Sequence, residues 1–270
     1  MNANELFKIA DRFTLESPAN YISDKSALSP ECSGLMIYEA PVFGFAAAND
    51  EIFSDFKSPD VIGENFMGPD EWLPGAKTVV AFYMPYTDSI MQANALDYSW
   101  PSDEWLHGRY EGQLFIKELC LHLQRIITNA GFECLIPAFD PRLKNGNSHT
   151  RFTCNWSERH AAYACGLGTF GLTRGIITER GSCIRFGSFL TNMELPVTAR
   201  PYGGVYEYCS KCGACIPHCP ANAISLENGK DNQRCSDFLD KTLEKHRPRY
   251  GCGKCQVNVP CSRGIPGKTR

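Results

Sequence analysis

Apolar residues recur at helical spacing in two stretches of the chain. Residues 3–15 predict an amphipathic opening helix. Its apolar positions are Leu6, Ile9, Ala10 and Phe13. Residues 109–130 predict the longest helix, and Gly131 stands directly after it as a stop signal. The apolar face of this second helix consists of Leu114, Phe115, Leu119, Leu123, Ile126 and Ile127.

Short β-branched and aromatic runs predict the strands. Residues 78–83 read Thr-Val-Val-Ala-Phe-Tyr, which is typical of a buried strand. Further strands are expected at residues 133–139, 175–178 and 183–191. A short helix over 158–165, capped by Asn155 or Ser157, precedes the last two. Residues 16–70 show no clear period, and irregular structure wrapped on a core is expected there.

Length and composition set the domain organisation. The 270 residues are 43% hydrophobic, enough for a substantial core. Prolines and glycines gather at residues 196–206 and mark a boundary. We therefore expect an α+β domain over residues 1–200 and a small second domain over residues 201–270.

Charge and hydropathy exclude several classes of protein. The net charge is −3 without a long basic block, which argues against a protein whose main role is to bind nucleic acid. No apolar run reaches the ~18–20 residues that cross a bilayer, so no membrane association is expected. The N-terminal sequence has neither a basic and apolar signal nor a twin arginine. The prediction is a cytoplasmic protein with reduced thiols.

Cysteines dominate the last quarter of the chain. Cys209, Cys212, Cys215 and Cys219 follow the spacing C-x2-C-x2-C-x3-C-P, with Pro220 closing the run. This is the bacterial-ferredoxin spacing for a [4Fe–4S] cluster. In two-cluster ferredoxins the fourth cysteine of such a run binds the other cluster. A second set of cysteines is therefore expected downstream.

That second set is Cys235, Cys252, Cys255 and Cys261. Eight cysteines suffice for two [4Fe–4S] clusters. The ferredoxin rule assigns Cys209, Cys212, Cys215 and Cys261 to cluster one. It assigns Cys219, Cys235, Cys252 and Cys255 to cluster two. Structural zinc and disulfides are the alternatives, and the triple spacing and the reducing compartment disfavour them. The other six cysteines are expected to be small buried hydrophobes.

A glycine-rich stretch follows the short predicted helix. Gly166, Gly168 and Gly171 match G-x-G-x-x-G, but a dinucleotide site needs a strand before the glycines and a helix after them. Here the order is reversed. The glycines indicate a backbone that closely approaches a flat or bulky group. The alternative is a tight corner between helix and strand without a ligand.

Several motifs together resemble a known family. They are Glu158-Arg159-His160-Ala161-Ala162, Gly166-Leu167-Gly168, Gly171, Ile176-Ile177-Thr178, Gly181, Arg185-Phe186-Gly187 and Leu190-Thr191, with Trp72 to Val80 upstream and the cysteines behind. Over roughly residues 70–261 the chain resembles epoxyqueuosine reductases and the core of reductive dehalogenases.

The resemblance implies a nitroreductase-like α+β domain that binds cobalamin, fed with electrons by a ferredoxin-like domain holding two [4Fe–4S] clusters. It places one loop against the corrin, consisting of Gly166, Leu167, Gly168, Thr169, Phe170 and Gly171. Arg174 and Arg185 would supply positive charge there. Tyr110 with Arg109 would be the counterparts of the dehalogenase proton donor, and His107 or His160 would be an axial ligand to cobalt.

Three departures qualify the resemblance. Epoxyqueuosine reductases carry a proton-donating aspartate shortly before the Glu-Arg pair, whereas residues 151–157 contain no acid. Their tRNA-reading C-terminal extension has no counterpart after Cys261. The last motif also reads Cys255-x5-Cys261-Ser262 in place of the family's C-x3-C-P.

The sequence thus predicts an iron–sulfur oxidoreductase, a cobalamin-dependent reductase of a small molecule of unknown identity. A ferredoxin or flavodoxin is the expected electron donor. The alternative is an electron-transfer or corrinoid-handling protein that passes electrons to a partner. A third alternative is a regulatory or structural protein that retains its clusters without catalysis.

Overall fold

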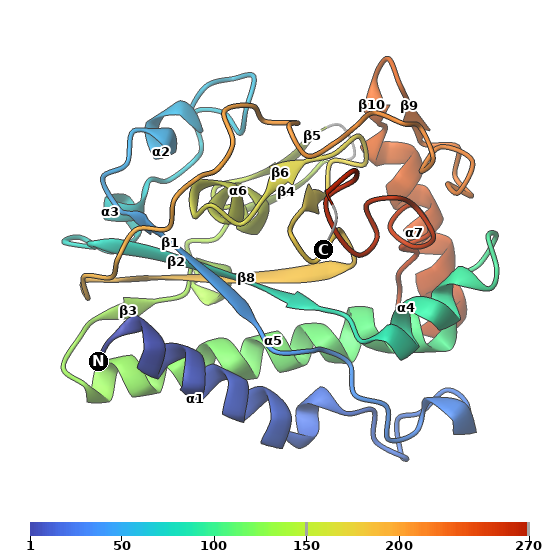
Figure 1. Cartoon of the computed structure of the whole chain (residues 1–270), viewed down its shortest axis with the longest axis horizontal. Coiled ribbons are helices and arrows are strands. Elements are labelled where there is room, and N and C mark those ends of the chain that lie inside the picture. Colours follow the sequence, from blue (N-terminus) through green and yellow to red (C-terminus); the bar gives the residue numbers. More distant parts are fainter. Residues whose placement is uncertain (149–150, 269–270) are drawn as a thin grey trace.

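The computed structural model describes residues 1–148 and 151–268. Its centre is a four-stranded antiparallel sheet in the order β1-β2-β8-β3 (Figure 1). These strands are β1 (Val42–Ala47), β2 (Thr78–Pro85), β8 (Ile184–Thr191) and β3 (Cys134–Leu135). In the register of the sheet, Val80 of β2 lies opposite Phe45 on one side and Phe189 on the other.

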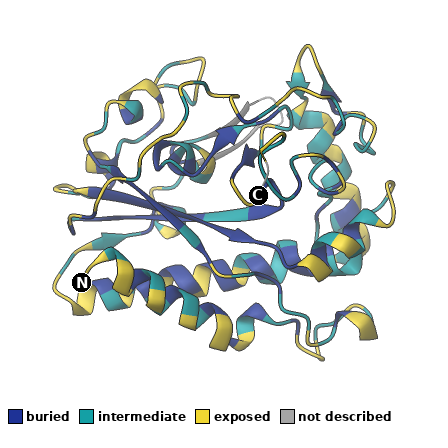
Figure 2. Ribbon diagram, in the orientation of Figure 1, coloured by how far each residue is buried: buried dark blue, intermediate teal, exposed yellow. Residues whose placement is uncertain are grey.

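All eight residues of β2 are buried, as its uninterrupted apolar sequence predicts (Figure 2). Because side chains alternate along a strand, β2 divides between two cores. Val80, Phe82 and Met84 join the core under α1 (Ala3–Glu16) and α5 (Asp103–Asn129). Val79, Ala81 and Tyr83 join the core under α6 (Glu158–Ala164).

Two helices line one face of the sheet (Figure 1). Helix α1 begins with a capping box between Asn2 and Glu5, and it matches the predicted opening helix. Helix α5 begins at Asp103, earlier than predicted, because Ser102 caps it by accepting the Trp105 N–H. Its first turns are buried on several sides, so they carry no amphipathic period.

The remaining elements are short, apart from the 15-residue helix α7 (Asn232–His246). The other helices are α2 (Ile52–Asp55), α3 (Pro69–Trp72) and α4 (Asp88–Ala95), with 3-10 turns at Pro18–Asn20, Pro30–Cys32 and Pro137–Phe139. The strands are β4 (Asn145–Ser148), β5 (Arg151–Cys154), β6 (Thr169–Phe170), β7 (Ile176–Ile177), β9 (Ile224–Ser225) and β10 (Gly229–Lys230). The strand predicted over 133–139 is therefore wrong beyond its first residues, because Pro137 starts a 3-10 turn.

The cysteine-carrying segment returns to the sheet and to α5. Gly253 packs on the indole of Trp105, and Gly251 packs on the side chain of Arg109. Near the C-terminus, Ser182 donates its N–H to the carbonyl of Cys261. The division at residue 200 stays a prediction. Among the described residues, no helix is both long and apolar enough to cross a membrane.

Candidate functional site

The first four cysteines that line a common space come from two distant parts of the chain. Cys209, Cys212 and Cys215 share a small cavity with Cys261. Burial raises the pKa of Cys215 to about 11, and charge on the nearby Cys261, Cys209 and Cys212 adds to this effect. The four thiols therefore lie close together. The exposed member is Cys212. This set coincides with the predicted ligands of cluster one.

The second four cysteines line a different and larger cavity. They are Cys219, Cys235, Cys252 and Cys255. Burial, assisted by charge on the neighbouring Cys235 and Cys219, raises the pKa of Cys252 to about 12. Asn94 of α4 holds this loop, since its Nδ2 donates to the Cys252 carbonyl at 2.9 Å. This set coincides with the predicted ligands of cluster two.

The chemistry of these donors suits iron–sulfur clusters, because four thiols line the smaller cavity and six line the larger one, where Cys120 and Cys154 join the second set. All fourteen cysteines carry free thiols. Within the described part of the chain, no three His, Cys, Asp or Glu side chains converge closely enough to hold a single metal ion.

The larger cavity has a volume of about 650 Å³, within the range of cofactor and ligand sites. Its walls come from α5, α6, β8, α7 and the second cysteine set. Apolar side chains form much of the lining: Tyr86, Trp105, Ile116, Ile136, Phe139, Trp156, Ile176, Ile184, Phe186, Phe238 and Leu239. A space of this size with apolar walls suits an organic ligand.

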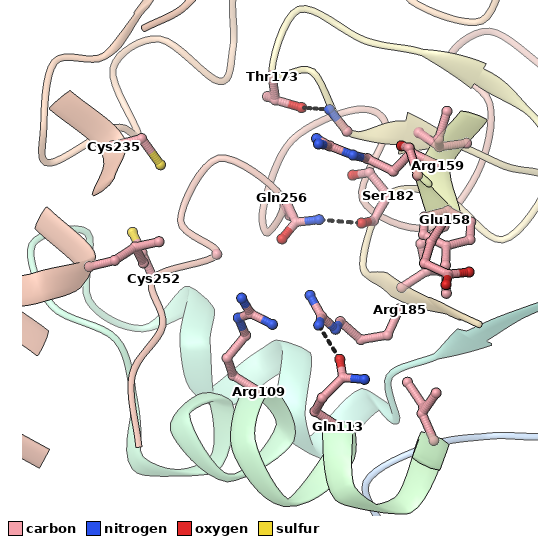
Figure 3. A pocket seen from close by; sticks show the side chains of 18 of the residues that line it. Arg109, Gln113, Glu158, Arg159, Thr173, Ser182, Arg185, Cys235, Cys252 and Gln256 are labelled. Atoms are coloured by element: carbon pink, nitrogen blue, oxygen red, sulfur yellow. Dashed lines mark hydrogen bonds between the residues drawn. The ribbon is translucent and has the colours of Figure 1, made fainter. Parts of the chain in front are cut away.

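Two arginines meet in this cavity (Figure 3). Arg109 comes from α5, and its Nη2 donates to the hydroxyl of Tyr250 at 3.1 Å. Arg185 comes from β8, and its Nη2 donates to Oε1 of Gln113 at 2.5 Å. Burial, followed by the nearby charge of Arg185, lowers the pKa of Arg109. Both charges thus face the cavity with neutral partners.

Glu158 lines the cavity at the start of α6, across from Cys235 and Cys252 in Figure 3. Its Oε2 is buried and has no hydrogen-bond partner among the described residues. Burial raises the pKa of Glu158 to about 7, and Ser188 and Arg185 only partly oppose this. A carboxyl group in this environment can give up a proton near neutral pH.

The other residues expected in the site lie apart from this cavity. Tyr110 is not among its lining residues, although its neighbour Arg109 is. Arg174 is exposed, and its backbone carbonyl accepts from Arg159 Nη1 at 2.7 Å. The loop from Gly166 to Phe170 is also absent from the lining, which instead includes Thr173, Gly175 and Ile176 from the same region.

The glycines of that loop meet protein backbone. A Cβ at Gly166 would come within 2.6 Å of the Ala199 carbonyl, and one at Gly168 would overlap the Ile177 carbonyl. Thr169 accepts the Tyr208 N–H on its hydroxyl. Gly171 lines the small cavity of the first cysteine set. These contacts fit a tight corner between helix and strand, and the role of the loop against a corrin stays a prediction.

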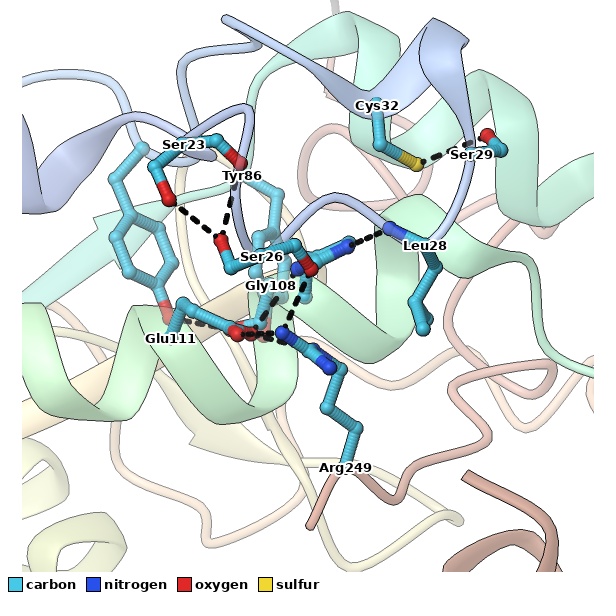
Figure 4. Close-up of polar contacts among 11 residues, drawn as sticks. Ser23, Ser26, Leu28, Ser29, Cys32, Tyr86, Gly108, Glu111 and Arg249 are labelled. Carbon is cyan, nitrogen blue, oxygen red and sulfur yellow. Dashed lines mark hydrogen bonds and ion pairs between the residues drawn. The ribbon is translucent and has the colours of Figure 1, made fainter. Parts of the chain in front are cut away.

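Neither histidine that was considered as an axial ligand lines the large cavity. His107 is fully buried, accepts the Leu28 N–H on Nε2 and places Nδ1 3.2 Å from Glu111. Arg249 joins Glu111 to the Ser26 carbonyl in the same network (Figure 4). His160 bonds Ser157 at 2.8 Å and packs on Phe rings, and burial lowers its pKa to about 4.

Sequence reasoning missed several polar residues of the cavity: Gln113, Glu158, Arg159, Lys230, Tyr250 and Gln256 have contacts or positions there that spacing does not reveal. The sequence did contain one indication of two of these residues. Glu158 and Arg159 belong to the motif on which the family resemblance rests, and the missing upstream acid directed attention to this stretch. The other side chains converge only through the fold.

Comparison with known proteins first defines the class. A family model described as a 4Fe-4S binding domain matches residues 205–225. The fold is that of an epoxyqueuosine reductase solved with an epoxyqueuosine-modified tRNA stem loop, with a TM-score of 0.52 at 21% identity over 84% of this chain and 63% of the other. A catabolic reductive dehalogenase in complex with 3-bromo-4-hydroxybenzoic acid gives a TM-score of 0.55 at 15% identity, over 84% of this chain and 30% of the other.

Curated relatives then narrow the resemblance. Epoxyqueuosine reductase of Bacillus cereus is 25% identical over 78% of this chain and 54% of its own length. The enzyme of Salmonella typhimurium is 31% identical over 72% of this chain and 50% of its own length. The chain thus spans about half the length of these relatives. The predicted resemblance is confirmed, and the chain is related to these iron–sulfur oxidoreductases.

Proposed function

We propose that the chain is a cobalamin-dependent iron–sulfur reductase that acts on a small molecule. The observation that carries this proposal is the large cavity itself. One side of it is lined by Cys219, Cys235, Cys252 and Cys255, and another by Glu158 and two arginines. A source of electrons and a source of protons therefore border one ligand-sized space, which is what a reductase needs.

The cysteines have the clearest role in this proposal. Cys209, Cys212, Cys215 and Cys261 would hold one [4Fe–4S] cluster, and the other four would hold the second. Exposure of Cys212 suits a first cluster that accepts electrons at the surface from a ferredoxin or flavodoxin. The second set, at the cavity wall, suits a cluster that passes electrons inward. Cobalamin, when bound in the cavity, supplies the low-potential reducing centre.

Glu158 is the proton donor in this proposal. It takes the place of the aspartate that residues 151–157 lack. Its buried Oε2 has no competing partner within the described structure. A protonated carboxyl that lines the cavity can pass its proton to a substrate while the apolar walls exclude water. The role predicted for Tyr110 is not retained, because Tyr110 does not line this space.

The substrate is proposed to be small. The relatives named for epoxyqueuosine reduction are about twice as long as the matched region, and one solved neighbour carries a tRNA stem loop. Another neighbour carries a bromohydroxybenzoic acid. The cavity of about 650 Å³ and the net charge of −3 favour a compact ligand over a polynucleotide.

The test is anaerobic reconstitution with iron, sulfide and cobalamin, followed by metal analysis and turnover with a chemical reductant. We expect about eight irons and one cobalt per chain. Reduction of an epoxide or of a halogenated aromatic acid should depend on the cobalt. Eight irons without retained cobalt would contradict the proposal and leave the second candidate, a two-cluster electron carrier, which the exposure of Cys212 also suits.

A further inference from the structure

We infer that Arg109 and Arg185 form an oxyanion clamp in the large cavity, and that the substrate carries a carboxylate or phosphate on an apolar body. The inference rests on the proposed function in one respect, because only that function makes the bound oxyanion a substrate. The binding of an oxyanion by these two residues is independent of turnover.

The first argument is the approach of two like charges. Arg109 and Arg185 come from different elements, α5 and β8, yet their guanidinium groups lie side by side in the cavity (Figure 3). Arg109 donates to Tyr250 and Arg185 donates to Gln113, and both acceptors are neutral. Arg109 also lies over the Tyr250 ring, 4.7 Å from its centroid. The fold therefore orients two cations that repel each other.

The second argument is the missing counter-charge. The described residues give neither arginine an ion pair within 4.0 Å, and Arg185 Nε is buried without any partner. Glu158 lines the same cavity, but burial raises its pKa and favours its neutral form, against the smaller opposing effects of Ser188 and Arg185. Both arginines are half-buried. A partly desolvated charge without a counter-ion is costly, so a ligand that supplies the negative charge would be favoured.

The third argument is geometric and chemical. Guanidinium groups match the planar oxygens of carboxylates and the oxygens of phosphates through paired hydrogen bonds. Arg185 Nε is buried and has no partner among the described residues, so one donor of this guanidinium is unused. Around the clamp the lining is aromatic and aliphatic, with Tyr86, Trp105 and Phe186 among its members. The oxyanion of such a ligand would bind the two arginines, and its apolar body would pack on the aromatic and aliphatic lining.

Two other cations of the cavity are less suited to this role. Arg159 already donates to the Arg174 carbonyl. Lys230 lies near Cys255, a member of the second cysteine set, so a cluster there would offset the charge of Lys230. The charge left for a further ligand is thus that of Arg109 and Arg185.

The experiment measures binding without turnover, by calorimetry on the reconstituted protein in its oxidised state. The probes are benzoate, phenyl phosphate and inorganic phosphate, with benzamide as the neutral match for benzoate. At least one anion should bind, and benzoate should exceed benzamide about tenfold. Arg185→Gln and Arg109→Gln should each weaken anion binding at least tenfold and leave benzamide unchanged. Arg185→Lys should fall between.

Arg125→Gln is the matched control, because Arg125 is exposed at the far end of the same helix as Arg109. Circular dichroism and iron content establish that each variant is folded. Absence of arginine-dependent anion binding at millimolar concentration would overturn the inference. So would loss of cobalamin retention in Arg185→Gln with unchanged anion affinity, because the pair would then serve the cofactor. Anion binding by protein that retains no cobalamin would contradict the proposed function and leave the clamp intact.

Discussion

Gly253 lies flat against the indole ring of Trp105, and no side chain fits between them. A Cβ at Gly253 would overlap three atoms of the ring, and the backbone there has φ +65°. This contact fixes the loop between Cys252 and Cys255 on the first turn of α5. The wall of the large cavity is therefore positioned by one glycine and one tryptophan.

Gly253→Ala should destabilise the protein and disturb the second cysteine set. The left-handed backbone costs about 1–2 kcal/mol for alanine, and the overlap with Trp105 adds about 1–3 kcal/mol. Thermal unfolding and iron content report the two effects. Gly75→Ala is the control, because Gly75 has φ +79° with open space around it. Equal losses in both variants would show that the Trp105 contact is unimportant.

Removing one cysteine from each set should remove one cluster at a time. Cys261→Ser should lower the iron content from about eight to about four per chain, and Cys235→Ser should do the same. Only the second change removes the cluster next to the cavity, so only it should alter spectra of a ligand bound there. Cys134→Ser, on strand β3, is the control and should leave the iron content unchanged. Loss of both clusters in either variant would contradict independent sites.

Glu158→Gln should change the pH dependence of both activity and stability. The pKa of Glu158 rises from 4.5 to about 7 on folding, so the folded state binds more protons than the unfolded state between these values. Stability of the wild type should therefore fall as pH rises from 4.5 to about 7, and the variant should lose this slope. Turnover should fall above about pH 7 in the wild type, when the carboxyl ionises.

The measurements are denaturant unfolding and turnover across this pH range. Glu118→Gln, an exposed substitution on α5, is the matched control. A Glu158→Gln variant with the wild-type pH profile of turnover would rule out Glu158 as the proton donor.

The sequence revealed the parts of the fold that repeat or follow a fixed spacing. Strand β2 was predictable because its residues are mostly β-branched, aromatic or otherwise apolar, and all are buried. Helix α1 was predictable because one face is buried and the other exposed. The start of α5 was missed because Gly108 and Gly112 accept the rings of Tyr86 and Tyr38, which hides the helical period. Strand β1, Val42–Ala47, was missed within a region that shows no clear period.

The candidate site divides in the same way. Cysteine spacing and the ferredoxin rule suggested two sets of four, and the same two sets line two cavities. The pairing of Arg109 with Arg185 was beyond the sequence, because it depends on how α5 crosses the end of β8. The role of Gly166 to Phe170 against a corrin stays a prediction, because close backbone approach is needed equally for a ligand and for another stretch of chain.

The two cysteine sets are interleaved along the chain, and this governs how the protein can mature. Cys219 belongs to the first run but lines the cavity of the second set, and Cys261 comes last but completes the first. Neither set can therefore be closed by a contiguous segment during synthesis. If the two sets bind clusters as proposed, neither cluster site is complete until the last loop, residues 252–261, has been synthesised and has folded against the rest of the chain.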